Sequence, residues 1–423
     1  MPAFNLSFKR KVDGARERHT AFASLRHRDF RLLWMGQFVS VIGSQMQMVA
    51  INWHIYLLTH SAFALGLVGL FRAGPIVLCS LLGGVVADVI DRRRLMIATQ
   101  FVMLTCSAIL ALVTLSGSQR VWPIYLLTAI ASAAWAFDTP ARQALVPALV
   151  PAKDFPNAVS LGMLMFQMGM IVGPALAGFL LASRGPALIY GLNAVSFIAV
   201  ILGLALMRTR GLPDPEEGTV TRVSFEALRE GLRFVWRTPV IVQTMTLDFI
   251  ATFFASANQL LPIYAKDILQ VGAQGLGFLV SAPAVGAVLA GLVMARMGVL
   301  KRQGLIVILS VAVFGAATIG FGLSRVFWFS LLMLAAIGAA DTVSTILRQT
   351  IRQLATPNNL RGRMTSINMI FFMGGPQLGE LEAGTLAAIA GAPLSVVTGG
   401  AACLIAATIA LSAAKRLRDY ERK

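Results

Sequence analysis

The chain has 423 residues, of which 57% are hydrophobic and only 13% are charged. Ordinary soluble domains carry about 25% charged residues, so this composition argues against a soluble domain and favours a membrane protein. The formal net charge of +17 could indicate a nucleic-acid partner. However, the basic residues follow alternate loops and form no single basic face, so we expect no nucleic acid.

Twelve apolar stretches follow one another along the chain, each long enough for the roughly 20 helical residues that cross a bilayer. They lie near residues 31–58, 62–86, 95–116, 121–144, 158–182, 187–207, 240–264, 276–297, 305–323, 326–347, 364–390 and 393–413. A backbone that crosses a bilayer must satisfy its own hydrogen bonds, so spans this long should be helices. The sequence therefore predicts an all-α membrane protein with twelve transmembrane helices.

Most lysines and arginines lie before the first stretch, in every second link and in the C-terminal tail. Since such residues are enriched in cytoplasmic loops, we expect both termini to be cytoplasmic.

The longest link divides the stretches six and six. Its second part reads VSFEALREGLRFVWR, in which Phe225, Leu228, Leu232 and Val235 recur at helical spacing. This pattern predicts an amphipathic helix on the inner membrane surface, with a plain connector as the alternative. The expected organisation is a basic N-terminal segment (1–30), an N-terminal half (31–207), a central cytoplasmic loop (208–239), a C-terminal half (240–414) and a basic tail (415–423).

The two halves resemble each other at one constant offset. Arg142 matches Arg348 at a shift of 206 residues (348 minus 142). The same shift aligns Pro151 with Pro357, Gly173 with Gly379, and Gly178 with Gly384. Tandem six-helix halves predict a pseudo-two-fold axis, with a cavity between the halves near the bilayer midplane.

A short turn after the second stretch carries an acid and a basic cluster in the sequence GGVVADVIDRRR. Glycine allows helices to approach closely, and Asp88 at a helix end could pair with a cation on a neighbouring helix. We therefore expect this turn to hold two moving helices together in one conformation. The alternative is an ordinary cytoplasmic turn whose arginines only set the orientation of the protein in the membrane.

Twelve stretches in two related halves, joined by a long central loop and carrying a Gly-x3-Asp-x3-Arg-Arg turn, resemble the major facilitator superfamily. Segments 36–60, 138–151 (DTPARQALVPALVP) and 378–384 (LGELEAG) resemble its enterobactin-exporter-like branch of drug and siderophore efflux proteins. The resemblance implies the major facilitator fold, a bacterial cytoplasmic (inner) membrane location, and export that commonly exchanges the substrate for protons. By position, it implies a gating role for Gly84, Asp88, Arg92 and Arg93, and a helix-packing motif at Gly173, Pro174 and Gly178.

Ionisable side chains inside a span are costly to bury, so each is a functional candidate. Arg72 lies close to the midplane, where it could bind an anionic substrate or pair with a carboxylate. Asp248 and Asp341 lie in the seventh and tenth spans, which by the resemblance line the cavity, and could load and release a proton. A permanent pair with a neighbouring arginine or threonine is the alternative. Glu380, in the eleventh span, is a further candidate.

Uncharged polar residues are concentrated in the first span. Gln45 and Asn52 share one helical face, which indicates either a water-lined wall or hydrogen bonds between helices. In the fourth span, Trp135 could stack on an aromatic ligand or pack in the core. Asp138 and Arg142 are four residues apart and can pair with each other, which suggests a gate or topology anchor.

No motif supports an enzyme, since the chain has no Gly-rich phosphate loop and no His and Cys cluster with metal-ligand spacing. We expect no cofactor and no metal. The sequence favours a monomeric secondary active exporter in the lipid bilayer that binds a small amphiphilic molecule and protons and works by alternating access. The alternatives are a lysophospholipid flippase of the same fold and a membrane receptor or scaffold that transports nothing.

Overall fold

The computed structural model describes residues 22–117, 120–209, 211, 225–255, 257–298, 300–357 and 360–420. In this part of the chain all regular structure is helical. The first long helices are α1 (Arg28–Thr59), α2 (Ala62–Val89), α3 (Arg92–Leu115), α4 (Trp122–Leu149), α5 (Phe155–Arg184) and α6 (Pro186–Leu206). After α7 (Phe225–Arg237) come α8 (Pro239–Phe254), α10 (Gly272–Arg296), α11 (Gln303–Leu323), α12 (Phe327–Ala355), α13 (Arg361–Ala390) and α14 (Ala392–Ala413). The short elements are η1 (Ala23–Arg26), η2 (Ala257–Leu260), α9 (Leu261–Ile263), the π-helical η3 (Tyr264–Ile268) and α15 (Lys415–Arg418).

Local sequence explains several helix boundaries. The Asp91 side chain accepts hydrogen bonds from the backbone N–H groups of Arg93 and Arg94, so it caps the start of α3. Gly185 and Gly391 follow α5 and α13 with φ angles of 73° and 88°, in a region that glycine enters without steric cost. These glycines are also 206 residues apart (391 minus 185), so the sequence repeat is matched by a repeated chain reversal.

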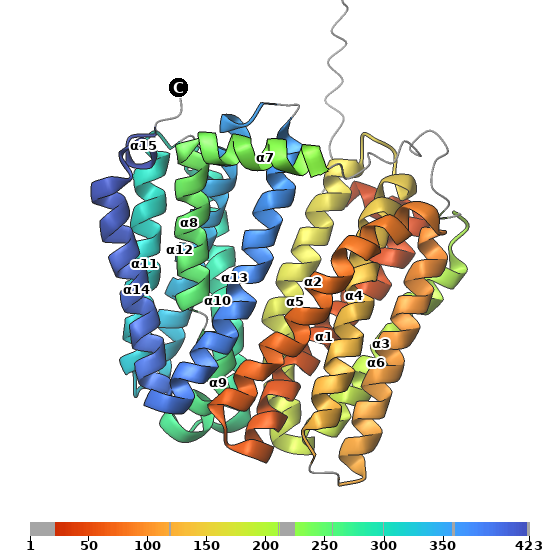
Figure 1. The fold of residues 1–423 in the computed structure, drawn as a ribbon. Helices are drawn as coiled ribbons and strands as arrows, with labels where there is room; N and C mark the ends of the chain where they lie inside the picture. The colour runs from red at the N-terminus through yellow and green to blue at the C-terminus, as the bar shows by residue number, and fades with distance from the viewer. Residues whose placement is uncertain are drawn as a thin grey trace, which may run out of the picture.

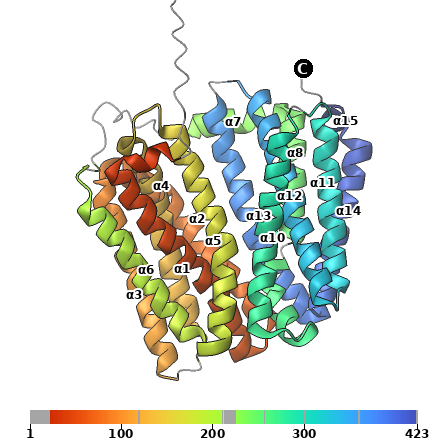
Figure 2. The ribbon, with the colours of Figure 1, turned by 180° about the vertical axis from the view of Figure 1, so that it is seen from behind.

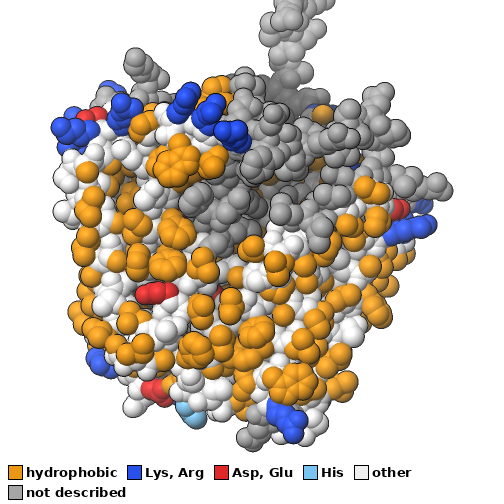
Figure 3. Space-filling view, viewed as in Figure 1, with side chains coloured by type: hydrophobic (Ala, Val, Ile, Leu, Met, Phe, Trp, Pro, Cys, Tyr) orange, Lys and Arg blue, Asp and Glu red, His pale blue; other side chains and the backbone are white. Residues whose placement is uncertain are grey.

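Nine helical stretches of the described chain are long and apolar enough to cross a membrane. They lie in α2, α3, α5, α6, the segment from α8 to η3, α10, α11, α12 and α14. Three helices of similar length, α1, α4 and α13, are not among them. Figure 3 shows side chains that are mainly apolar across the middle of one face, with lysines and arginines gathered at its rims. The expected number of twelve spans therefore stays a prediction, and the difference lies in the three more polar helices.

The long helices form two neighbouring groups, α1–α6 and α8–α14, while α7 lies across one end of the molecule (Figures 1 and 2). The helix expected in the central link is thus present, although the side chains of Phe225 and Leu228 lie outside the described residues. We call the end that carries α7 and α15 the α7 end, and the opposite end, formed by α9 and η3, the α9 end.

The two groups meet where α2 packs on α13 and α5 packs on α10. Glycines bring these helices together near the α9 end. A Cβ atom on Gly384 would lie 2.7 Å from the Cα atom of Gly66, and one on Gly178 would lie 3.0 Å from the Cα atom of Gly277. The Tyr56 hydroxyl of α1 also donates a hydrogen bond to Asp267 of η3. The α9 end is therefore tightly packed across the boundary between the groups.

Candidate functional site

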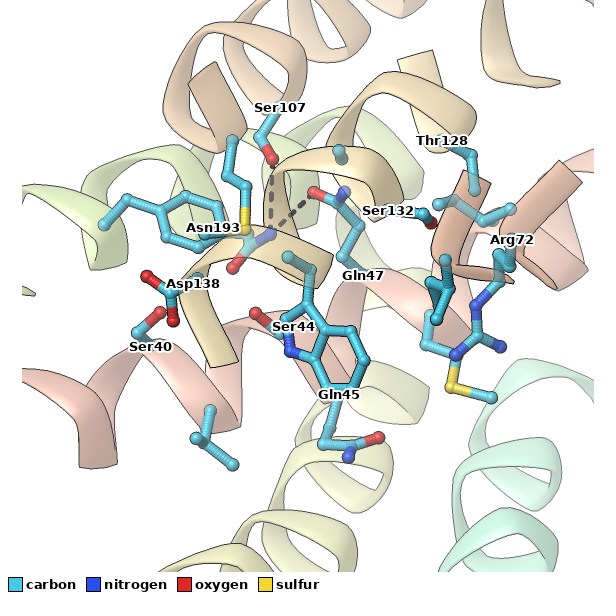
Figure 4. A pocket seen from close by; sticks show the side chains of 18 of the residues that line it. Ser40, Ser44, Gln45, Gln47, Arg72, Ser107, Thr128, Ser132, Asp138 and Asn193 are labelled. Carbon is cyan, nitrogen blue, oxygen red and sulfur yellow. Dashed lines mark hydrogen bonds between the residues drawn. The ribbon is translucent and has the colours of Figure 1, made fainter. Parts of the chain in front are cut away.

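A cavity of about 370 Å³ lies among α1–α6 and reaches α13. This volume falls within the range of about 300–1,000 Å³ for small-molecule sites. Figure 4 shows polar side chains around it from several helices, with Asp138 and Ser40 on one side and Arg72 and Thr128 on the other. The sequence placed a cavity between the two halves, whereas this cavity is lined almost entirely by the first group of helices, because their polar side chains face inward.

The wall formed by α1 follows from helical spacing. Its cavity-lining polar residues are Gln37, Ser40, Ser44, Gln45, Gln47 and Asn52. On another face of α1, a Cβ atom on Gly36 would lie 2.8 Å from the backbone oxygen of Ala199 in α6, so glycine permits this close packing. Gln45 and Asn52 both line the cavity, which is compatible with the first of the two alternatives, and their contact with a substrate stays a prediction.

A hydrogen-bond network lies behind this wall. The Asn193 side-chain amide of α6 donates to Gln47 Oε1 at 2.8 Å and to Ser107 Oγ of α3 at 3.3 Å. These three side chains are buried, so the network joins three helices through their interior. Figure 4 shows both bonds to Asn193.

Several buried polar atoms of the cavity lining have no hydrogen-bond partner in the described structure. They are Gln37 Nε2, Asn52 Oδ1, Gln100 Oε1, Thr128 Oγ1 and Gln377 Oε1. Leaving a buried donor or acceptor unpaired costs about 1–3 kcal/mol, so each of these atoms would gain from a water molecule or a ligand. The set contains one donor amide, three acceptor amide oxygens and a hydroxyl, which suits a molecule with several hydrogen-bonding groups.

The expected pair between Asp138 and Arg142 is wrong. Asp138 Oδ1 instead accepts hydrogen bonds from Thr99 Oγ1 at 3.0 Å and Gln100 Nε2 at 2.9 Å, both on α3. Arg142 Nη1 donates to Gln37 Oε1 on α1 at 3.0 Å. Spacing of four residues permits a pair along one helix, but both side chains find partners on other helices. Both residues line the cavity, and their gating role stays a prediction.

Arg72 also lines the cavity, and it interacts electrostatically with Glu380 of α13. Glu380 is only 7% exposed, and its Oε2 atom accepts a hydrogen bond of 2.8 Å from Gln259 Nε2 of η2. The structure thus brings together two candidates that lie far apart in the sequence and on different groups of helices. Trp135 lines the same cavity with 37% of its surface exposed, so it is not a core residue.

A cluster of charges occupies the second group of helices. Arg348 Nη2 lies 2.7 Å from Asp248 Oδ1 and 3.7 Å from Asp341 Oδ1, and Arg352 Nη1 lies 3.9 Å from Asp248 Oδ2. Asp248 and both arginines are buried, whereas half of the Asp341 side chain is exposed. Asp248 is therefore paired with a neighbouring arginine, which was the alternative to a proton-carrying role. The Asp341 side chain remains half exposed.

The turn between α2 and α3 is described only in part, because the surroundings of Gly84 and the side chain of Asp88 lie outside what the structure describes. Arg92 Nη1 donates to the backbone oxygen of Ala144 near the end of α4 at 3.1 Å. Arg93 Nη2 donates to the backbone oxygen of Ala205 at the end of α6 at 2.9 Å. The Ala205 carbonyl lies in the last turn of α6, where carbonyl groups lack a partner within the helix and favour cations. Both arginines tie α3 to neighbouring helices, Arg92 to α4 and Arg93 to α6. Their gating role stays a prediction.

The motif in α5 packs helices on two sides. A Cβ atom on Gly173 would lie 2.6 Å from Gln45 Cβ of α1, and one on Gly178 would lie 2.8 Å from the backbone oxygen of Ala273 in α10. The Pro174 backbone oxygen would lie 2.5 Å from a Cβ atom on Gly277 of α10. These small residues therefore allow α5 to lie closely against both groups of helices.

Sequence reasoning missed several polar residues around the cavity. Gln100, Ser107 and Asn193 lie in the third and sixth apolar stretches, and Gln259 lies beyond the end of α8. Polar residues inside an apolar span are functional candidates, and this signal marks Gln100 and Asn193 as well as the amides of the first span. No local signal connected Gln259 with Glu380, because they come from separate elements.

A family model described as transmembrane secretion effector matches residues 19–423 of this chain. The chain belongs to that family, within the major facilitator superfamily. The enterobactin exporter EntS of Salmonella typhimurium is 28% identical over 403 residues, covering 94% of each chain. EntS of Escherichia coli O1:K1 is 27% identical over the same length and coverage. The resemblance predicted from the motifs is therefore confirmed.

Solved structures show the same fold at low sequence identity. The peptide transporter POT has a TM-score of 0.75 and 13% identity, covering 93% of this chain and 95% of that chain. A bacterial homologue of the iron transporter ferroportin has a TM-score of 0.67 and 15% identity, covering 91% and 98%. The family match and the EntS relatives, together with the apolar helices, identify a multi-pass efflux transporter of the bacterial inner membrane that acts on a small molecule and is not an enzyme.

Proposed function

We propose that this transporter exports a small molecule with several hydrogen-bonding groups, of the siderophore or drug class, in exchange for protons. The observation that carries the proposal is the polar cavity, whose buried amide and hydroxyl atoms lack partners. The relatives are named as exporters of enterobactin, which supports a siderophore-like substrate. Cavity-lining aromatic residues such as Trp135 and Phe166 would contact the apolar parts of such a molecule.

In this proposal all twelve long helices cross the membrane, and α1, α4 and α13 are more polar because they line the transport path. The α7 end faces the cytoplasm, as the clustering of basic residues predicts. The close contacts at the α9 end keep that side closed while the substrate enters from the cytoplasm. Rocking of the two groups about the cavity would then expose the substrate on the other side.

Asp341 is the best candidate for the proton site. It shares Arg348 with Asp248, and only Asp341 has an exposed side chain. If Asp341 takes up a proton, Asp248 still balances the charge of Arg348, so the buried arginine keeps a partner. Asp248 would then be the fixed counter-ion of the cluster, and Asp341 the group that exchanges protons.

The test uses purified protein in liposomes that contain a pH-sensitive dye. We expect a catecholate siderophore or an amphiphilic drug from a panel to dissipate an imposed pH gradient. The Asp341→Asn variant should lose proton-driven transport but retain counterflow exchange of the same compound. Flux without any dependence on the pH gradient would contradict proton exchange and favour a flippase. The absence of flux from folded protein across the panel would contradict transport and favour a receptor or scaffold.

A further inference from the structure

Glu380 lies at the contact between the two groups of helices. Its Oε2 atom would lie 2.6 Å from a Cβ atom on Gly69 of α2, and its backbone oxygen would lie 3.1 Å from one on Gly66. Gly69 and Arg72 are three residues apart, so they share one face of α2. The Glu380 carboxylate is therefore pressed against the α2 face that also carries Arg72.

Only two polar groups are recorded as interacting with this carboxylate in the described structure. One is the neutral amide of Gln259, which donates a hydrogen bond of 2.8 Å, and the other is the charge of Arg72, which acts on the carboxylate without a direct ion pair. A buried carboxylate depends on its counter-ion, because an amide hydrogen bond replaces only part of the lost hydration. Arg72 therefore stabilises the packing of Glu380 against α2.

Arg72 is also part of the cavity wall, so the same guanidinium can be reached by a bound molecule. A guanidinium prefers planar anions such as carboxylates, which it binds through paired hydrogen bonds. An anionic group in the cavity would therefore compete with Glu380 for one cation. When Glu380 loses that cation, its burial between α2 and α13 becomes unfavourable.

We propose that Arg72 binds an anionic group of the transported molecule and thereby releases Glu380, which loosens the α2–α13 contact at the α9 end. This inference rests on the proposed function, since it assumes that the cavity holds the substrate. It gives the substrate at least one anionic group such as a carboxylate. It also connects the occupied cavity to the opening of the opposite end.

The experiment measures opening of the α9 end directly. Ala387 is 6% exposed and follows Gly384 by three residues. A Cβ atom on Gly384 would meet Gly66 of α2, so helical spacing places Ala387 close to the same face of α13. An Ala387→Cys substitution, made after Cys79, Cys106 and Cys403 are replaced by serine, would report opening through its rate of alkylation by a hydrophilic thiol reagent. The probes are benzoate, benzamide and benzylamine, which share a ring and differ in charge.

We expect benzoate to raise the alkylation rate several-fold, and benzamide and benzylamine to leave it nearly unchanged. In Arg72→Gln the effect of benzoate should disappear. In Arg72→Lys, which keeps the charge but loses the planar fork, a reduced effect should remain. Arg72→Gln should already be alkylated rapidly without any probe, because the buried Glu380 carboxylate has lost its cation. Glu380→Gln has no charge that needs a counter-ion, so it should be alkylated slowly with or without benzoate. The matched control Glu382→Gln, two residues along the same helix, should behave like the parent.

Three results would overturn the inference: equal responses to benzoate and benzamide, an unchanged benzoate response in Arg72→Gln, or a full benzoate response in Glu380→Gln. If benzoate neither changes the alkylation rate nor shifts the melting temperature of the parent protein, the cavity does not bind an anionic group, and the proposed anionic substrate is wrong. Liposome flux of the panel compounds is measured separately. If the panel compounds are transported but these responses are absent, only the proposed role of Arg72 is refuted. If no compound is transported, the proposed function itself is refuted.

Discussion

The two groups of long helices bury different kinds of polar side chains. In the first group, the cavity is surrounded by amides and hydroxyls, and Asp138 is bound by the neutral groups of Thr99 and Gln100. In the second group, Asp248 and Asp341 share arginines at ion-pair distances. Neutral polar groups can recognise a molecule without a large change in charge, whereas a charge cluster responds to protonation. In the proposed function, recognition of the substrate therefore lies mainly in the first group, and proton exchange lies in the second.

The largest expected effect comes from breaking the charge cluster. In Arg348→Ala, Asp248 loses its nearest counter-ion while it remains buried. Removing one partner of a buried ion pair costs about 3–5 kcal/mol, so the free energy of unfolding should fall by this amount. Chemical denaturation in detergent measures it, with Arg296→Ala at an exposed position as the control. A loss of less than about 1 kcal/mol would show that the cluster is solvated.

Next comes the neutral network of the first group. Asn193→Ala removes the donor that binds Gln47 and Ser107 and leaves buried acceptors unpaired, which should cost about 1–3 kcal/mol. The Asn193→Ala/Gln47→Ala double variant should lose less than the sum of the single variants, because the two residues share one bond. Additive losses in a double-mutant cycle would contradict the network.

A smaller change in stability tests whether Asp138 is held by Thr99 and Gln100, as observed, or by an ion pair with Arg142, as the sequence suggested. Asp138→Asn keeps an oxygen that can accept from Thr99 and Gln100, so the free energy of unfolding should change by about 1 kcal/mol, the difference between charged and neutral hydrogen bonds. Adding Arg142→Gln should have an independent effect. Strong coupling between the two substitutions would indicate an ion pair. The first group of helices would then hold a buried ion pair, as the second group does.

The smallest effect concerns Asp29, which joins the start of α1 to the end of α6 outside the spans. Burial raises the pKa of Asp29, but hydrogen bonds from the Thr209 side chain and from the backbone N–H groups of Thr209 and Arg208, together with the charge of Arg28, lower it below its ordinary value of 3.8. A lowered pKa in the folded state means that the contribution is complete above about pH 3.8 and is lost as the pH falls through the folded pKa. Asp29→Asn should therefore reduce stability at pH 7, by less than about 1 kcal/mol because solvent screens the site. Denaturation at pH 7 and pH 3 measures it, and an equal loss at both values would exclude the charge as its cause.

Much of the fold could be predicted because membrane helices leave strong local signals. Apolar stretches of about 20 residues located the long helices, and the shift of 206 residues identified the repeat that also relates Gly185 to Gly391. The amide spacing of the first span predicted that Gln45 and Asn52 share one face, and both residues line the cavity. The stretches that correspond to α1, α4 and α13 were also predicted as spans, but these helices carry more polar residues and are not among the nine apolar ones, so their crossing of the membrane stays a prediction.

The sequence by itself determined the helical class, the membrane environment, the family and which residues were candidates. Only the tertiary structure decided their partners: Arg142 with Gln37, Arg72 with Glu380, and Arg348 with both Asp248 and Asp341. The physical reason is that periodicity fixes the face of a helix on which a side chain lies, whereas its partner depends on which helix packs against that face. Those packing contacts join residues that are often more than 100 positions apart in the chain, for example Gln37 and Arg142.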